Sequence, residues 1–444
     1  MERIVFLHPN FNFGDEGIFN RVWPPLSLAV SAAMLEEDGL DVRIVDAHAL
    51  DLTPSEAVAQ VGEADMLFIT TSSLDKWQCP HFNLKFIEDF VREFRQNSKA
   101  MIIVEGIHGT VEPMWVFEHI APDYLIRAEP EEVVRKICNG TKPETTKGVS
   151  YLKDGKLVEN PLPTPPDLDK FPMPAFHLLP MEKYYYEVMG GKFTLLEGAR
   201  GCPFKCIFCL QKMYYGYRTK SAENLLREID YAVTEFGVKN IYFIDLEFTV
   251  NRKLAETVCN HLIEKKYKLR WCCQTRADSV DEKLLALMKR AGCALIHYGV
   301  ETGSPEIMKL INKNITLEKI YSGVKMTHKA GIETACFFMF GFPGETEDQM
   351  RKTVEFALKL NPTYASFHSA APYPGTKLGD MAGGGFKTHL PEHDFEVLRG
   401  MVKKAFLKFY LRPAYIISRA RRGSPASWMR QLRLFTRYIT KTLI

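Results

Sequence analysis

Short apolar runs alternate with amphipathic helical stretches over most of this chain of 444 residues, and this alternation limits the folds open to it. Buried parallel strands read as continuous apolar runs, because helices cover both faces of their sheet. Five such runs fall in the first 140 residues, at Ile4–Leu7, Val42–Val45, Met66–Thr70, Met101–Val104 and Tyr124–Ile126. The pattern predicts an α/β domain over residues 1–145 with a doubly wound, flavodoxin-like (Rossmann-like) sheet, whose ligands lie at the carboxyl ends of the strands.

A second block of alternation begins after a stretch that is rich in proline. Seven prolines between Pro161 and Pro180 predict an extended linker, which we place at residues 146–185. Six further apolar runs follow at Phe193–Leu196, Ile241–Ile244, Leu269–Cys273, Leu295–Tyr298, Glu333–Met339 and Tyr364–His368. They predict a partial (β/α)6 barrel of the TIM type over residues 186–385, with its chemistry at the carboxyl ends of the strands.

The last segment, residues 386–444, is predicted to be a basic helical region. From Arg399 to the end it has twelve basic residues and no acidic one, interleaved with aromatic and leucine residues. Two interpretations stay open. The segment either lies on an anionic membrane or a partner, or packs its apolar face on the barrel while its lysines and arginines face water.

Three cysteines, Cys202, Cys206 and Cys209, stand at C-x3-C-x2-C spacing just after the first strand of the barrel. Three thiolates can hold three irons of a cubane cluster and leave the fourth iron open to a substrate, whereas ordinary electron-transfer clusters take four cysteines. A structural zinc site completed by Cys272 or Cys273, or three buried apolar cysteines, is the alternative. Zinc sites usually pair two cysteines with a second pair or with histidines, so we favour the cluster.

Composition narrows the function classes. The formal charge of +3 gives no argument for nucleic acid as a partner, and no apolar run approaches the roughly 20 residues needed to span a bilayer. The other seven cysteines are scattered, mostly in apolar stretches, and are interpreted as reduced core residues. An oxygen-sensitive cluster and reduced thiols lead us to expect a cytoplasmic enzyme.

The cysteine spacing resembles the signature of the radical S-adenosylmethionine (SAM) enzymes. The resemblance implies a [4Fe-4S] cluster whose open iron binds SAM, an electron donor such as flavodoxin or ferredoxin, and an aromatic residue, here Phe208, near the adenine. It also directs attention to polar residues at the ends of the later strands. These predicted SAM contacts are Asp245, Glu247, Arg276, Glu301 and the glycine-rich segment that begins at Gly341.

The first domain resembles cobalamin (B12)-binding domains, and in particular those of the cobalamin-dependent radical SAM enzymes. Ser72-Ser73-Leu74 and Glu105-Gly106 look like their S-x-L and G-G elements. The further cobalamin contacts that the resemblance implies are Trp77, His108, Gly109, Thr110 and Glu129. The D-x-H-x-x-G element is absent, because residues 9–17 contain no histidine, and neither His8 nor His48 has that motif around it. We therefore expect bound cobalamin to lack a histidine ligand.

Together the two resemblances imply a C-methyltransferase that acts on an unactivated carbon of a small-molecule or peptide substrate. One SAM supplies the methyl group through cobalamin, and a second supplies the 5'-deoxyadenosyl radical. One alternative keeps both cofactors but performs cyclisation, rearrangement or dehydration. A lower alternative is a cobalamin or iron-sulfur binding protein without turnover.

Overall fold

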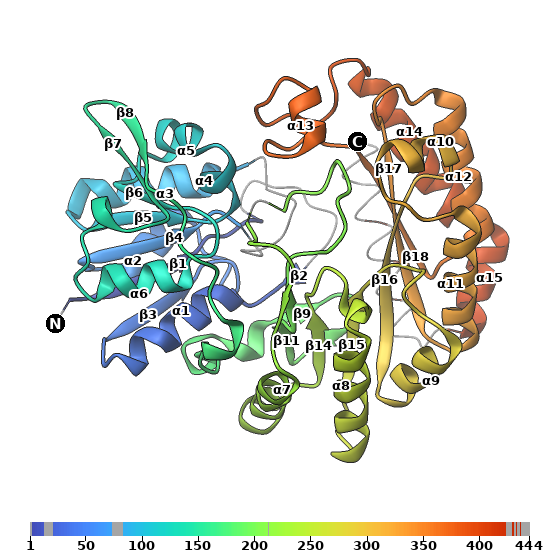
Figure 1. Cartoon of the computed structure of the whole chain (residues 1–444), viewed down its shortest axis with the longest axis horizontal. Helices are drawn as coiled ribbons and strands as arrows, with labels where there is room; N and C mark the ends of the chain where they lie inside the picture. Colours follow the sequence, from blue (N-terminus) through green and yellow to red (C-terminus); the bar gives the residue numbers. More distant parts are fainter. Residues whose placement is uncertain are drawn as a thin grey trace.

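The structure is a computed structural model that describes residues 2–12, 21–72, 83–211, 213–422, 429, 432 and 436. It contains two α/β halves that lie side by side (Figure 1). Both predicted sheets are present, and the apolar runs named above coincide with their strands to within a few residues.

The first half is built on a sheet with the order β3-β1-β4-β5-β6-β7-β8. Its five parallel strands are β1 (Ile4–His8), β3 (Val42–Asp46), β4 (Met66–Thr70), β5 (Met101–Glu105) and β6 (Tyr124–Ile126). This strand order is that of flavodoxin-like folds, in which the chain reverses direction across the sheet between β1 and β4. The covering helices are α1 (Leu26–Glu37), α2 (Pro54–Val61), α3 (Lys85–Asn97), α4 (Ile107–Val111), α5 (Pro113–Ile120) and α6 (Glu131–Cys138).

The sheet continues past residue 145, where the sequence predicts the domain to end. The antiparallel hairpin β7 (Val149–Lys153) and β8 (Lys156–Glu159) pairs with β6 inside the predicted linker. This hairpin is a polar edge with little buried surface, so its sequence lacks the continuous apolar runs of the other strands. The chain that follows it runs past α1 toward the second half.

Six parallel strands form the open barrel of the second half, in the order in which they occur in the chain. They are β11 (Phe193–Leu196), β14 (Asn240–Phe243), β15 (Arg270–Gln274), β16 (Cys293–Glu301), β17 (Glu333–Phe340) and β18 (Tyr364–Ser369). The helices α7 (Ala222–Phe236), α8 (Arg252–Glu264), α9 (Glu282–Arg290), α10 (Pro305–Leu310), α11 (Leu317–Lys329) and α12 (Glu347–Leu360) lie outside them (Figure 1). The predicted barrel is confirmed.

A small sheet joins the two halves. β2 (Arg21–Val22) pairs with β9 (Tyr185–Tyr186), which in turn pairs with β10 (Gly190–Gly191). Trp23 follows β2 and packs against Phe193 and Tyr242 of the barrel. Val22, Trp23 and Leu26 therefore belong to the same apolar cluster as the barrel core, and the two halves form one packed body.

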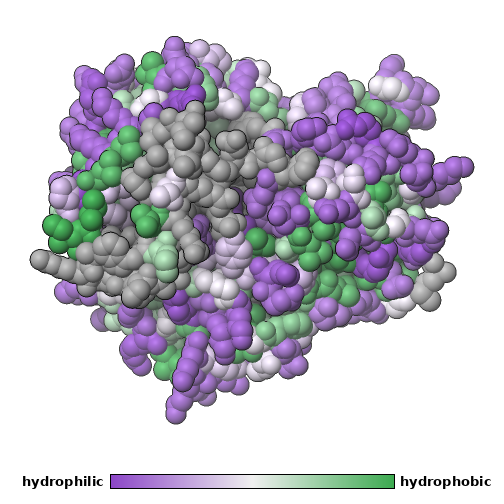
Figure 2. Space-filling view, turned by 180° about the vertical axis from the view of Figure 1, so that it is seen from behind, coloured by the Kyte–Doolittle hydropathy of each residue, from purple (hydrophilic) through white to green (hydrophobic). Residues whose placement is uncertain are grey.

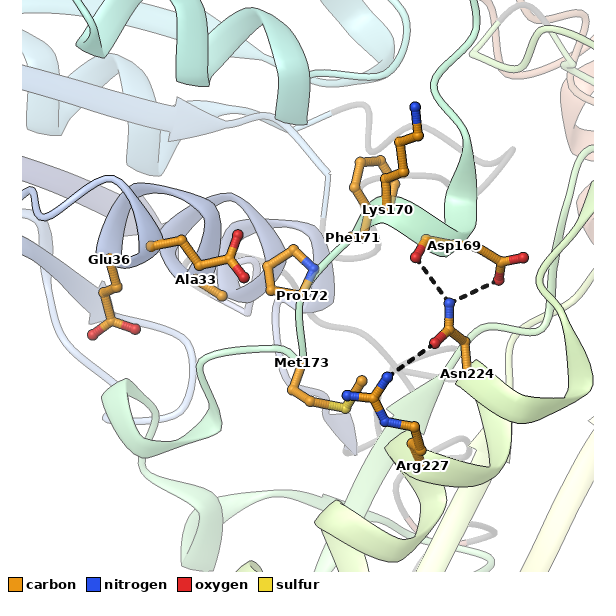
Figure 3. A pocket seen from close by; sticks show the side chains of 10 residues that line it. Ala33, Glu36, Asp169, Lys170, Phe171, Pro172, Met173, Asn224 and Arg227 are labelled. Carbon is orange, nitrogen blue, oxygen red and sulfur yellow. Dashed lines mark hydrogen bonds between the residues drawn. The ribbon is translucent and has the colours of Figure 1, made fainter.

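The linker also lines a pocket of about 600 Å³ between α1 and α7 (Figure 3). Asp169 accepts hydrogen bonds from the side chain of Asn224, which lies beside Arg227. The pocket contains none of the residues that the sequence predicts for cofactor binding. The pocket lies where the linker packs against α1 and α7.

The basic tail begins by packing on the barrel. In α14 (Phe395–Tyr410), Phe409 contacts Phe367 of β18, and the Tyr410 hydroxyl bonds the backbone of Ala365. α15 (Pro413–Arg422) follows, and Tyr415 donates to the carbonyl of Thr363. For the described helices α14 and α15, the structure supports the second interpretation of the tail, in which it packs on the barrel.

The outer surface is characterised by the hydropathy of its residues. Figure 2 shows one face covered largely by hydrophilic residues, with smaller apolar areas between them. Within the described residues, no helix combines the length and the apolar character that crossing a membrane requires.

Candidate functional site

The cysteine loop connects β12 (Ala199–Arg200) to β13 (Arg218–Thr219), two short strands that pair with each other. Gly201 opens the loop with φ +74°, and a Cβ atom there would overlap the carbonyl oxygen of Gly216 across the loop. Glycine is therefore required where the two ends of the loop close on each other. This closure fixes the position of the three cysteines above the barrel.

Cys202, Cys206 and Cys209 form no disulfide with another described cysteine, and all three are partly exposed. Burial raises the pKa of all three thiols, to about 12 for Cys202, and the charges of Cys202 and Cys206 raise that of Cys209 further. Three thiols on one short loop, whose charges would raise one another's pKa, suit a bound cation that neutralises them. The residues present therefore fit an iron-sulfur cluster.

The zinc alternative does not fit this geometry. Among the described residues, no three histidine, cysteine, aspartate or glutamate side chains are arranged around the position of a single metal ion. In a cubane, by contrast, each cysteine binds a different iron. Cys272 and Cys273, the two suggested completing ligands, are fully buried in β15 and interact with Cys293.

A second loop, residues 311–314, holds the cysteine loop in place. The backbone N–H of Ile207 donates to the carbonyl of Ile311, and the side chain of Asn312 donates to the carbonyl of Lys205. Arg276 in turn donates to the carbonyls of Lys313 and Asn314, and its guanidinium lies 4.1 Å from the ring centre of Phe204. Arg276 thus joins the two loops, with Asp278 as its ion-pair partner.

Lys313 is a site residue that the sequence analysis missed. Its ammonium lies 2.7 Å from Glu301, and both side chains are 8% exposed. Burial opposes the charge of Lys313, but Glu301 and Cys206 outweigh it and hold the lysine pKa above its ordinary value. Glu301 has φ +68°, a strained conformation for a residue with a side chain, at an irregularity of β16. The structure thus places a cation beside the predicted carboxylate and close to Cys206.

Asp245 and Glu247 lie just after β14, as predicted. Burial raises the pKa of each to about 7. Asp245 accepts a hydrogen bond of 3.0 Å from the backbone of Gly198, whereas Thr275 reaches Glu247 only at 3.4 Å. Backbone N–H groups also bond both carboxylates, that of Arg276 in the case of Glu247. Each carboxylate has more than one lone pair, so both can still accept hydrogen bonds from a ligand that brings ammonium or hydroxyl groups.

The glycine-rich loop after β17 is organised by Glu345, which accepts hydrogen bonds from the backbone N–H groups of Gly341 and Phe342. Gly341 has φ +87°, and a Cβ atom there would lie 3.0 Å from Leu398 of α14. Packing against α14 therefore explains this glycine, and its predicted SAM contact stays a prediction. Phe342 lies 5.8 Å from Phe208, so two aromatic rings meet where the adenine is expected.

At the carboxyl edge of the first sheet lies a buried network of polar side chains. His8, the last residue of β1, bonds Asp46 at 2.9 Å, and the Tyr184 hydroxyl donates to the other oxygen of Asp46 at 2.6 Å. His48 Nε2 donates to the carbonyl of Arg21. Among the described residues, His8 Nε2, His48 Nδ1 and Ser72 Oγ are buried without a hydrogen-bond partner. Such orphaned atoms at the point where a doubly wound sheet binds ligands fit a large polar cofactor there.

The other predicted cobalamin residues lie at the same edge. Gly106 has φ +110°, and a Cβ atom would lie 2.7 Å from the Thr71 hydroxyl, so only glycine fits. Glu105, His108 and Gly109 are buried beside it. The Thr110 hydroxyl contacts the sulfur of Met213, and His108 packs 5.2 Å from Phe386. Ser73, Leu74 and Trp77 lie outside the described residues.

Glu129 has both carboxylate oxygens in ion pairs with the second half, one with Arg200 and one with Arg218. Arg200 also pairs with Glu131 at 2.7 Å and with Glu197 at 2.8 Å, and it is 1% exposed. We call these five residues the interdomain clasp. The clasp connects the base of the cysteine loop to the carboxyl edge of the first sheet, which we call the cobalamin edge because cobalamin is predicted to bind there. The contact of Glu129 with the barrel is observed, and its contact with cobalamin remains a prediction.

The comparisons with known families agree with this geometry. The family model of the B12 binding domain matches residues 19–137, and that of the radical SAM superfamily matches residues 196–357. An uncharacterized methyltransferase of Pyrococcus horikoshii is 30% identical over 94% of both chains. An anaerobic magnesium-protoporphyrin IX monomethyl ester cyclase of Rubrivivax gelatinosus is also 30% identical, over 85% of this chain and 69% of the cyclase.

Among solved structures, the cobalamin-dependent SAM radical enzyme OxsB, with aqua-cobalamin and SAM bound, shares the fold. Its TM-score is 0.74 at 18% identity, and the match covers all of this chain and 71% of OxsB. The fold, both family models and the full-length relative point the same way. The chain belongs to the radical SAM superfamily, in the branch whose members carry an amino-terminal B12 binding domain.

Proposed function

We propose that the chain is a cobalamin-dependent radical SAM C-methyltransferase acting on an unactivated carbon of a small molecule. The observation that carries the proposal is the interdomain clasp, because it holds the cysteine loop and the cobalamin edge against each other in one packed body. When bound, the cluster and SAM supply a 5'-deoxyadenosyl radical, and cobalamin supplies the methyl group.

The residues of the chain bind and orient these groups. Cys202, Cys206 and Cys209 would hold the cluster. Glu247 and Asp245 offer acceptors to the ammonium and ribose hydroxyls of SAM. The ammonium of Lys313 pairs with Glu301 but has three donors, so it also offers a donor and a charge to the SAM carboxylate. Arg276 was predicted for that carboxylate, but its guanidinium already bonds Asp278 and the carbonyls of Lys313 and Asn314. We therefore assign Arg276 to positioning the loop that carries Lys313.

Methyl transfer is favoured over cyclisation by the extent of the matches. The relative named a methyltransferase matches over 94% of its length, whereas about a third of the cyclase has no counterpart in this chain. A position in the cytoplasm and an electron donor such as flavodoxin or ferredoxin are further parts of the proposal.

The test uses the full chain, reconstituted without oxygen with iron, sulfide and cobalamin, and given a reductant and SAM carrying a CD3 group. A methyltransferase produces 5'-deoxyadenosine and transfers CD3 to cobalamin and to a compound in a small-molecule extract. Formation of 5'-deoxyadenosine without any transfer of CD3 would favour the cyclisation alternative. Absence of both products would leave a binding protein.

A further inference from the structure

Strand β18 presents two kinds of side chain on its two faces. Ala365 and Phe367 face outward, because the backbone of Ala365 bonds Tyr410 of α14 and the ring of Phe367 packs on Phe338 and Phe409. Side chains alternate along a strand, so Ser366 and His368 face the inside of the barrel. Neither residue was singled out by the sequence.

The inside of the barrel is more open here than its outside. His368 is exposed, and Ser366 and the inward-facing Phe337 and Met339 of the neighbouring strand are partly exposed. The outward-facing Phe338 and Phe340 are fully buried. Small parallel barrels normally fill their interior with side chains. Among the described residues, these side chains therefore form an accessible wall inside the barrel.

This wall lies at the mouth that faces the cobalamin edge. His368 stands at the carboxyl end of β18, opposite Met339 in the sheet register. Although the side chain is accessible from the inside of the barrel, the protein groups packed around the imidazole and the charge of Arg21, which comes from β2 of the first half, lower the pKa of His368 to about 4. The imidazole is thus close to the junction of the two halves and is neutral at physiological pH.

Ser366 fixes the orientation of this imidazole. The Ser366 hydroxyl and His368 Nε2 share a hydrogen bond of 2.6 Å. Among the described residues, Nδ1 of His368 has no partner. Deeper in the barrel, His297 bonds Tyr242 at 3.1 Å and Tyr186 at 3.4 Å, and Tyr242 donates to Gln274. The deeper polar groups satisfy one another, whereas Nδ1 of His368 is left for a ligand.

We propose that Ser366 and His368 form the substrate-contacting wall of the active site, where Nδ1 of His368 hydrogen-bonds an uncharged polar group of the substrate, such as a hydroxyl, carbonyl or amide. This inference rests on the proposed function. An uncharged group is favoured because the wall consists of a neutral imidazole, a hydroxyl, Phe337 and Met339, and a buried ion would need an opposite charge beside it. The nearby cation, Arg21, has its guanidinium over the ring of Trp23.

The first test reads ligand binding without turnover. Histidines of the reconstituted full chain are modified with diethyl pyrocarbonate, in the presence of a small-molecule extract separated by ion exchange into neutral, anionic and cationic fractions. Peptide mass spectrometry should show at least fivefold slower modification of His368 with the neutral fraction only. His389, a partly exposed histidine beside Phe395, serves as the internal control. Protection by a charged fraction alone, or no protection, overturns the inference.

The second test uses the compound that accepts CD3 in the extract. His368→Ala should raise the KM for that compound at least tenfold, and His368→Gln, which keeps a hydrogen-bonding group, should recover part of the loss. His389→Ala should leave kcat and KM unchanged. A KM that is unchanged in His368→Ala overturns the inference while methyl transfer by the natural chain still supports the proposed function. If no CD3 is transferred, the proposed function is wrong, and the protection test alone decides the inference.

Discussion

Replacing Arg200 of the interdomain clasp by glutamine should destabilise the whole chain. Arg200 is 1% exposed, and its three carboxylate partners, Glu129, Glu131 and Glu197, are at most 5% exposed. The substitution leaves these three carboxylates buried without the charge of the arginine, while Arg218 still pairs with Glu129. Breaking a buried ion pair by removing one partner costs about 3–5 kcal/mol, which is a large share of the about 5–15 kcal/mol that keeps a protein folded.

The chain offers a matched control in Arg252. This arginine also pairs with two carboxylates, Glu256 and Asp281, but it is 44% exposed. Exposed pairs of this kind contribute about 0–1 kcal/mol. In urea unfolding of the full chain, followed by circular dichroism, Arg200→Gln should therefore lower the free energy of unfolding several times more than Arg252→Gln.

The pH dependence supplies a second check on Arg200→Gln. Without the arginine, burial should raise the pKa of the remaining carboxylates above their unfolded-state values, so the folded variant binds more protons than the unfolded one. Its stability should then fall, relative to the natural chain, as the pH rises from about 5 to 8. Equal losses for both arginine variants, or a loss that does not change with pH, would refute the argument.

Three further predictions concern the cofactor sites. Burial raises the pKa of Asp245 to about 7, so the free energy of unfolding of the natural chain should fall as the pH rises from about 4 to about 7. In Asp245→Asn this loss is absent. The difference in free energy of unfolding between variant and natural chain, measured in urea, should therefore grow by up to about 1.4 kcal/mol per pH unit over that range. A constant difference would contradict this. Lys313→Met should weaken SAM binding to the reconstituted chain at least tenfold in equilibrium dialysis. Lys309→Met, which changes an exposed lysine, should leave the affinity unchanged. Equal affinities of the two variants would show that Lys313 does not bind SAM. Bound cob(II)alamin should show no hyperfine coupling to a histidine nitrogen in its electron paramagnetic resonance spectrum, and His48→Ala should leave that spectrum unchanged; a histidine coupling would overturn the predicted absence of a protein ligand.

Elements that bury continuous apolar surface were predictable from the sequence. Met66–Thr70 is buried on every side, and its sequence alone identifies the strand β4. The hairpin β7–β8 was not predicted, because an exposed edge strand needs no apolar run. The two-residue strand β2 was missed as well, since so short a segment carries no periodic signal.

The same distinction holds for the site. The positions of Asp245, Glu247 and Glu301 at the barrel mouth were predictable because each follows an apolar run, and strand ends meet there; their contacts with SAM stay predictions. Lys313 lies in a polar turn after α10, where a lysine is ordinarily solvated, so only the fold reveals that it reaches Glu301. Two partners of Arg200, Glu129 and Glu131, are about 70 residues away in sequence, and no local pattern encodes an ion pair over that separation.

The distance between the two cofactors tests the central claim most directly. Our account holds that the cysteine loop and the cobalamin edge are fixed against each other by the interdomain clasp. In the full chain reconstituted with cluster and cobalamin, pulsed electron paramagnetic resonance should therefore detect dipolar coupling between the reduced cluster and cob(II)alamin. This coupling should disappear in Cys206→Ala, which lacks a cluster ligand. Two cofactors bound in full amount but magnetically independent of each other would contradict the account.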